Sequence, residues 1–333
     1  MKAIFLTIGQ KKGWGMILFY ISVFMVGTTP IQSQEGKFPS KPVEIIVPYA
    51  PGGIIDLGTR IFGESLSREL KVPVVIKNQA GGGGLIGSTA FLNAKPDGYT
   101  LLSGCAGAII STVQLSKNPP FDPRKDLLPV GYMADAPLAM SVPKTSPFKS
   151  FDEFVQFAKS NPGRLKGGVT SLGSENHIMF MSIIRDANVE SKMIPYPGTG
   201  QLVTAILGGH LDWMTLTLPA TMPYVKSGDV RILLLTRKSP ELPNVPAGPD
   251  IGLSSFSVNI WTGLLVLPQT PKATYDTLVS AVNAASQDPQ ITKKLANAGF
   301  YVSYRNPHEF SNVIKDQWEI FSRIIKETGI KVD

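Results

Sequence analysis

The sequence has little cysteine and little histidine. Cys105 is the only cysteine among 333 residues, so the chain cannot form an internal disulfide and its stability has to come from core packing. The 3 histidines, His177, His210 and His308, show neither the i, i+4 spacing nor the Cys-x-x-Cys partners of common zinc sites. The sequence therefore gives no support for a bound metal.

Long apolar runs are also lacking. The apolar stretch near the N-terminus, Met16–Val26, covers about eleven residues, whereas a membrane-spanning helix needs roughly 20. Lys2, Lys11 and Lys12 precede it and small or polar residues follow it, which is the layout of a cleaved secretory signal peptide. We therefore predict a signal peptide over residues 1–33, a mature chain that begins near Gln34, and export to the periplasm. An uncleaved membrane anchor is the less favoured alternative.

A cluster of lysine and arginine interleaved with aromatic residues is absent as well, so the sequence does not favour a nucleic-acid partner. The formal net charge is +7, and removing the three lysines of residues 1–33 leaves +4 for the mature chain. A mildly basic exported protein is compatible with an anionic small-molecule ligand, although charge alone does not select one.

What the sequence does contain is an alternation of short β-branched runs and longer helical stretches. In the first part, Val43–Tyr49 reads as a strand, 56–70 as an amphipathic helix, 72–77 as a second strand and 99–103 as a third. Strands that alternate with helices imply right-handed crossovers and a parallel sheet.

A second block of the same kind begins near Ala136. Its first helix has Ser150 as N-cap and Glu153 three residues on, and strands are expected over 165–170, 212–217 and 230–236. Two segments, 128–140 and 255–265, are long enough to cross between blocks, and an amphipathic C-terminal helix capped by Asn306 is expected to dock on the first sheet.

These elements predict a two-lobed α/β protein in which each lobe is a mostly parallel sheet flanked by helices. Two crossing segments allow the lobes to close on a ligand by hinge motion. The expected division is a signal peptide over 1–33, the first part of lobe 1 over 34–135, lobe 2 over 136–255, and a return to lobe 1 over 256–333.

The turn after the first strand, from Tyr49 through Ala50, Pro51 and Gly52 to Gly53, leads directly into a helix that contains Ile54 and Asp56. Its glycines let the backbone approach a ligand, and free amides at the start of a helix favour an anion. Ligands of open α/β sheets bind beyond the carboxyl ends of strands, which is where this turn lies. A plain tight turn is the alternative.

Two further glycine-rich turns follow in the first lobe. Gly82, Gly84 and Gly87 form a literal G-x-G-x-x-G, but no acidic residue stands about 20 residues on, so a flexible anion-binding loop is favoured over a dinucleotide site. The turn from Ser103 to Ala106 offers one hydroxyl, while Cys105 reads as a small packing residue.

In the second lobe, Ser171, Gly173 and Ser174 form a polar turn between a strand and a helix, and His177 follows one helical turn later. The turn can offer hydroxyls and backbone N–H groups to a ligand. A secreted serine hydrolase with Ser174 as nucleophile and His177 as base is the alternative, but no G-x-S-x-G elbow surrounds the serine. Thr199, at the start of a short helix, and Thr217, at a strand end, are further candidates.

Several collinear motifs resemble those of one family, the substrate receptors of tripartite tricarboxylate transporters, also called Bug receptors. They are Ile46-Val-Pro-Tyr-Ala-Pro-Gly-Gly53 with Asp56, Lys95-Pro-Asp-Gly-Tyr-Thr-Leu-Leu102, Pro195-Tyr-Pro-Gly-Thr199, Leu207-Gly-Gly-His-Leu-Asp212, Leu218-Pro-Ala-Thr-Met-Pro223 and Leu242-Pro-Asn-Val-Pro246. The resemblance covers nearly the whole mature chain.

The resemblance implies a protein with the periplasmic-binding-protein (Venus flytrap) fold that binds a small organic acid in the periplasm. On the same ground we expect that it uses no cofactor, catalyses no reaction and delivers its ligand to membrane transporter subunits. The resemblance also implies that the turn from Tyr49 to Gly53 grips a ligand carboxylate through backbone groups, while the turn from Ser171 to Ser174 and the loop at Thr199 help to set specificity. We expect a monomer. A receptor that reports its ligand to a membrane sensor is an alternative that the sequence leaves open.

One departure from the family concerns the ligand. Such receptors typically read glycine and then threonine or serine before the aspartate, whereas this chain has Ile54-Ile55-Asp56. We therefore expect a mono- or dicarboxylate with an apolar or aromatic body. The residues expected to contact it are Tyr49, Ala50, Pro51, Gly52, Gly53, Ile54, Asp56, Ser103, Ala106, Ser171, Gly173, Ser174, His177, Thr199 and Thr217.

Overall fold

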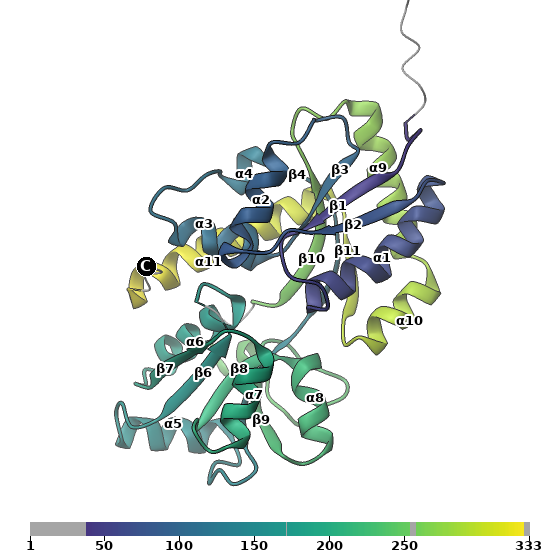
Figure 1. Ribbon diagram of the computed structural model, residues 1–333. Coiled ribbons are helices and arrows are strands. Elements are labelled where there is room, and N and C mark those ends of the chain that lie inside the picture. The colour runs from purple at the N-terminus through teal and green to yellow at the C-terminus, as the bar shows by residue number, and fades with distance from the viewer. Residues whose placement is uncertain (1–37, 171, 254–257, 330–333) are drawn as a thin grey trace, which may run out of the picture. The chain divides into compact units, whose positions relative to one another are not determined.

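The computed structural model of the chain describes residues 38–170, 172–253 and 258–329. The predicted signal peptide, residues 1–33, and the candidate Ser171 lie outside the described residues. The described part forms two β-sheets with flanking helices (Figure 1).

The first sheet has the strand order β11-β4-β10-β3-β1-β2. Its strands are β1 (Val43–Val47), β2 (Val74–Asn78), β3 (Thr100–Gly104), β4 (Leu128–Ala136), β10 (Ile260–Val266) and β11 (Tyr301–Arg305). β1 pairs in parallel with both β2 and β3, and Figure 1 shows these three strands side by side. Apart from Glu44, β1 is apolar and buried, as expected of an inner strand that helices cover on both faces.

The second sheet has the order β7-β6-β8-β5-β9. Its strands are β5 (Leu138–Pro143), β6 (Lys166–Thr170), β7 (Lys192–Tyr196), β8 (Trp213–Thr217) and β9 (Val230–Leu235). β6 pairs in parallel with β7 and β8, whereas β5 runs antiparallel to β8 and β9.

The two-lobed α/β fold is confirmed, but the sheets are mixed and not mostly parallel. Three of the five strand pairings in the first sheet and two of the four in the second are antiparallel. One reason is that β4 continues into β5 through Pro137 alone, so β5 enters the second sheet without a crossover helix and can run opposite to its neighbours.

The first crossing between the sheets takes place at one residue. β4 ends at Ala136 in the first sheet and β5 begins at Leu138 in the second, so the chain changes sheets at Pro137. The carbonyl of Pro137 accepts a hydrogen bond of 2.8 Å from the amide of Leu218. The second predicted crossing includes residues 254–257, which lie outside the described residues, so the predicted lobe boundaries remain predictions.

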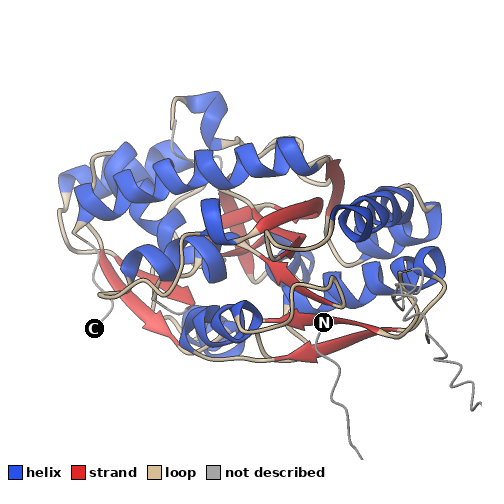
Figure 2. Cartoon of the chain, turned by 90° about the horizontal axis from the view of Figure 1, so that it is seen from above, coloured by secondary structure: helices blue, strands red, loops and turns tan. Residues whose placement is uncertain are grey.

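Helices lie on both sides of the strands (Figure 2). Those that follow first-sheet strands are α1 (Ile54–Leu70), η1 (Gly82–Gly84), α2 (Leu85–Leu92), the π-helix η2 (Gly107–Ser111), α3 (Thr112–Leu115), α4 (Pro123–Asp126), α9 (Lys272–Ser286), α10 (Pro289–Asn297) and α11 (Pro307–Thr328). Those of the second block are α5 (Phe151–Ser160), α6 (Glu175–Asp186), α7 (Thr199–Leu207), α8 (Leu218–Lys226) and η3 (Gly248–Ile251).

The C-terminal helix α11 docks on the first sheet, as predicted. Asn306 and Glu309 form the expected capping box. The buried Phe310 ring meets Tyr132 of β4 and Trp261 of β10 edge-on, with ring centroids 5.6 and 5.1 Å apart. The same helix also contacts α6 of the second block.

One continuous cluster of buried apolar side chains draws on both sheets and includes Phe310 of the first block and Phe154 of the second. Two smaller clusters lie within the second block. Across residues 38–170, 172–253 and 258–329, no helix is both long and apolar enough to cross a membrane.

Candidate ligand-binding site

Parallel pairing brings the turns after β1 and β3 to one edge of the first sheet. The carboxyl ends of adjacent parallel strands point the same way, so the segment after Val47 lies beside the segment after Gly104. The Cys105 thiol donates to the Tyr49 hydroxyl at 3.4 Å, which joins the two turns directly. The Tyr49 hydroxyl in turn donates to the Gly83 carbonyl at 3.2 Å.

The turn from Ala50 to Gly53 is exposed at this edge. Gly52 has a φ of +82°, which glycine adopts without strain, and no atom lies within 4 Å of where its Cβ would be. Gly53 is the N-cap of α1 but has no side chain to bond the first amides of the helix. The turn is therefore exposed and leads into a helix start without a side-chain cap, and its contact with a ligand stays a prediction.

The buried Asp56 side chain fixes this turn from the protein interior. That side chain is 2% exposed, and its Oδ2 accepts from the Gly52 amide at 2.8 Å and from Arg60 Nε at 3.0 Å. Asn78 donates to Asp56 Oδ1 at 2.8 Å and to the Tyr49 carbonyl at 3.0 Å. Burial works to raise the pKa of Asp56, but the hydrogen bonds from Arg60, Gly52 and Asn78 and the Arg60 charge hold that pKa below its usual value. Both carboxylate oxygens are engaged inside the protein, so Asp56 positions the turn.

Two other candidates of the first lobe also face the protein interior. Ser103 is fully buried, and its hydroxyl is 2.6 Å from that of Thr59 and 3.1 Å from that of Thr262. Ala106 is fully buried as well. Ile54 is half-buried at the start of α1 and is the one residue of the Ile54-Ile55 pair with appreciable exposure.

In the second block, the residues after β6 form a helix cap. The Ser174 hydroxyl donates to the Thr170 carbonyl and accepts from the His177 amide at 3.3 Å. The Gly173 amide donates to His177 Nδ1 at 3.0 Å. His177 is 2% exposed, and burial lowers the pKa of its imidazole to about 4.

The contacts of Ser174 and His177 do not resemble those of a nucleophile and its base. The serine hydroxyl donates its proton to a backbone carbonyl, and the Nδ1 of the histidine already accepts a backbone N–H. A hydrolase needs the base to accept the proton of the nucleophile, so the geometry does not favour the hydrolase alternative.

Thr217 ends β8 and Thr199 follows β7, and these two strands are the neighbours of β6. Thr217 is 6% exposed and is the N-cap of α8. Thr199 is exposed and is the first residue of α7, whose N-cap is Gly198.

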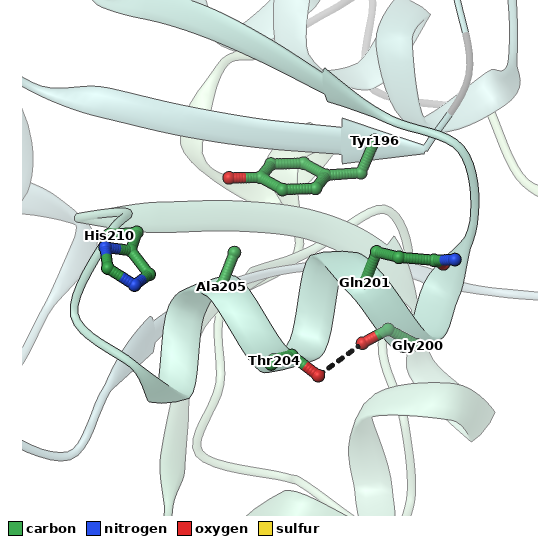
Figure 3. A pocket seen from close by; sticks show the side chains of 6 residues that line it. All are labelled: Tyr196, Gly200, Gln201, Thr204, Ala205 and His210. Atoms are coloured by element: carbon green, nitrogen blue, oxygen red, sulfur yellow. Dashed lines mark hydrogen bonds between the residues drawn. The ribbon is translucent and has the colours of Figure 1, made fainter.

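A groove of about 580 Å³ runs along α7 beside Thr199 (Figure 3). The Tyr196 ring lies over one side of α7, and His210 lies beyond the far end of the helix. The Thr204 hydroxyl, which is also on this helix, donates to the Gly200 carbonyl at 2.9 Å. No candidate residue of the first sheet lines this groove.

The two sheets meet at a side chain that the sequence did not single out. Glu175, the first residue of α6, accepts a hydrogen bond of 2.6 Å at its Oε1 from the amide of Gly107, the first residue of η2. Glu175 is 4% exposed, and burial raises the pKa of its carboxyl although the Gly107 amide works in the opposite direction. The carboxyl ends of β3 and β6 thus face each other.

This arrangement of polar turns at facing strand ends agrees with the family to which the sequence is matched. The family model described as "Tripartite tricarboxylate transporter family receptor" matches residues 59–330. The chain belongs to this receptor family.

Similar proteins support the same assignment. The receptor is 29% identical to the protein BugT of Bordetella pertussis over 298 residues. These aligned residues cover 89% of this chain and 91% of BugT. Its fold is similar to that of MatC from Rhodopseudomonas palustris with bound malate, at 27% identity and a TM-score of 0.75, covering 86% of this chain and 100% of MatC. It is also similar to R. palustris Rpa4515 with adipate, at 25% identity and a TM-score of 0.78, covering 88% of this chain and 99% of that protein.

A weak signal for Glu175 was present in the sequence. It follows the N-cap Ser174 directly, and an acidic residue in the first turn of a helix is usually explained by the helix dipole. In this receptor the same carboxylate reaches a residue 68 positions away in the chain, and local sequence rules do not predict that contact.

Proposed function

We propose that the chain is a periplasmic receptor that captures a small organic acid, a mono- or dicarboxylate with an apolar or aromatic body. It delivers the acid to the membrane subunits of a tripartite tricarboxylate-type transporter. It acts as a monomer and does not transform its ligand.

The observation that carries the proposal is the exposed turn from Ala50 to Gly53. Asp56 holds the Gly52 amide from behind, and the amides at the uncapped start of α1 have no side chain of Gly53 to satisfy them. Preorganised backbone N–H groups at the start of a 17-residue helix are suited to a carboxylate. Malate and adipate, which are named with two similar structures, are both organic acids and support this ligand class.

The apolar body of the ligand is proposed from Ile54. This side chain is half-buried next to the turn, where a hydroxyl-bearing residue would favour a fully polar ligand. Apolar surface of the ligand that covers Ile54 adds roughly 25 cal/mol for each Å² removed from water.

The test is a thermal-shift screen of the mature chain, residues 34–333, against matched aliphatic and aromatic carboxylates, the corresponding amides, amino acids and sugars. A ligand at a hundredfold excess over its Kd stabilises the folded chain by about 2.7 kcal/mol, which raises the melting temperature by several degrees. We expect acids to raise it and their amides to have no effect. Stabilisation by amides or sugars but not by acids would contradict the proposal.

A further inference from the structure

The contact between Glu175 and Gly107 has the chemistry of a carboxylate-binding site. The group that occupies it is a carboxylate, and the Gly107 amide donates to it at 2.6 Å from Oε1. The Cys105 thiol is within hydrogen-bonding reach of the same carboxylate, with its proton directed to the Tyr49 hydroxyl. The Tyr49 hydroxyl borders the same space and donates its own proton to the Gly83 carbonyl. We call these three groups of the first sheet the carboxylate seat.

The shape of the seat depends on the missing side chain of Gly107. A Cβ at this position would lie 2.8 Å from Glu175 Oε2 and 2.8 Å from the Tyr49 hydroxyl, closer than such atoms approach one another. Glycine at 107 therefore leaves the room that the Glu175 carboxylate fills. With Glu175 only 4% exposed, the seat is filled.

The seat lies at the same sheet edge as the turn proposed to bind the ligand. Tyr49 contributes its hydroxyl to the seat and is followed directly by Ala50, the first exposed residue of that turn. The seat is thus a donor position beside the turn that a second ligand carboxylate could use, and a protein carboxylate already occupies it.

We propose that Glu175 is a specificity-determining residue: its side chain fills the carboxylate seat, so the receptor binds acids with one carboxylate in preference to diacids of the same length. This inference rests on the proposed function and narrows its ligand class to monocarboxylates.

The experiment compares hexanoate with adipate, and butyrate with succinate, by calorimetric titration of the wild-type chain, E175Q and E175A. The glutamine side chain of E175Q keeps the volume and an oxygen that accepts from Gly107, so this variant is the matched control for occupation of the seat without charge. In E175A the seat is open. A charged hydrogen bond changes affinity by about tenfold or more.

We expect wild type and E175Q to bind the monoacid at least about tenfold more tightly than the diacid, and E175A to gain at least about tenfold in affinity for the diacid. Acetate should raise the melting temperature of E175A more than that of the other two proteins, while chloride should not. E175S provides the same opening if E175A fails to fold.

Three results would overturn the inference and leave the proposed function intact: wild type binds the diacid as tightly as the monoacid, E175A gains no affinity for the diacid, or E175Q gains as much as E175A. The last would mean that charge, and not occupation of the seat, excludes the diacid. If none of the acids binds to any of the proteins, the proposed function itself fails.

Discussion

Gly173 has a left-handed backbone conformation and also lies close to a side chain of the other block. Its φ is +78°, and a Cβ there would lie 3.2 Å from Leu115 Cδ1 of α3, next to the first sheet. Since a side chain strains this conformation, we expect G173A to lower the free energy of unfolding by about 1–2 kcal/mol.

Chemical denaturation of G173A beside G200A tests this expectation. Gly200 lies within α7 and has open space around its Cβ position, so G200A should be neutral or stabilising by up to about 1 kcal/mol. Equal effects of the two substitutions would show that the conformation and contact of Gly173 are unimportant.

His177 makes stability depend on pH. Burial lowers the pKa of its imidazole from 6.5 to about 4, so the unfolded chain binds a proton between these values and the folded chain does not. The stability due to neutral His177 is complete above pH 6.5 and is lost as the pH falls toward 4. Between pH 7 and 4.5 the loss amounts to about 2.5 kcal/mol.

H177N is the variant that isolates this effect, because an asparagine oxygen can still accept the hydrogen bond that Gly173 donates to Nδ1. We expect the unfolding free energy of wild type to fall by about 2 kcal/mol more than that of H177N when the pH is lowered from 7 to 4.5. Parallel pH profiles for the two proteins would contradict a buried neutral imidazole.

At the scale of elements, the sequence predicted those helices and strands whose local pattern agrees with their packing. α7 begins at Thr199, as predicted, and the N-cap and apolar stripe of α11 indicated both its start and the face that docks. The sequence analysis did not predict β4 and β5 as strands or α8 as a helix. α8 contains Pro223, which usually breaks a helix, but buried Leu218 and Thr221 and the hydrogen bond from Leu218 to Pro137 anchor it.

The location of the candidate site was predictable, but the direction of its side chains was not. Parallel strands fix which turns share a sheet edge, so the turn from Ala50 to Gly53 could be proposed from the strand pattern. Whether Asp56 and Ser103 face a ligand or the core depends on partners such as Asn78 and Thr262, which are distant in sequence. The approach of Glu175 to Gly107 depends on how the two sheets meet.

At the scale of the whole molecule, the continuous apolar cluster predicts that both sheets unfold together. Phe154 packs edge-on against Trp213 in the second block, and Phe310 packs against the first sheet, yet both belong to the same cluster. We expect F154A and F310A each to cost about 3–5 kcal/mol and to shift the same single transition.

Differential scanning calorimetry of the mature chain, F154A and F310A checks this expectation. A single transition whose calorimetric and van't Hoff enthalpies agree is the expected result for all three proteins. Two transitions, one moved only by F154A and the other only by F310A, would mean that the blocks fold independently. The substitution K315A, at an exposed position on α11, serves as a control that leaves the transition in place.

The position of the single cysteine gives the protein an intrinsic reporter of its own opening. Cys105 has no exposed surface, and burial together with the charge of Glu175 raises the pKa of its thiol well above the ordinary value. A thiol-specific dye can therefore react only when this contact opens, because the thiolate is the reactive form. The labelling rate of Cys105 thus reports how often this contact opens. The effect of an organic acid on that opening can be followed in the unmodified protein, without an engineered cysteine.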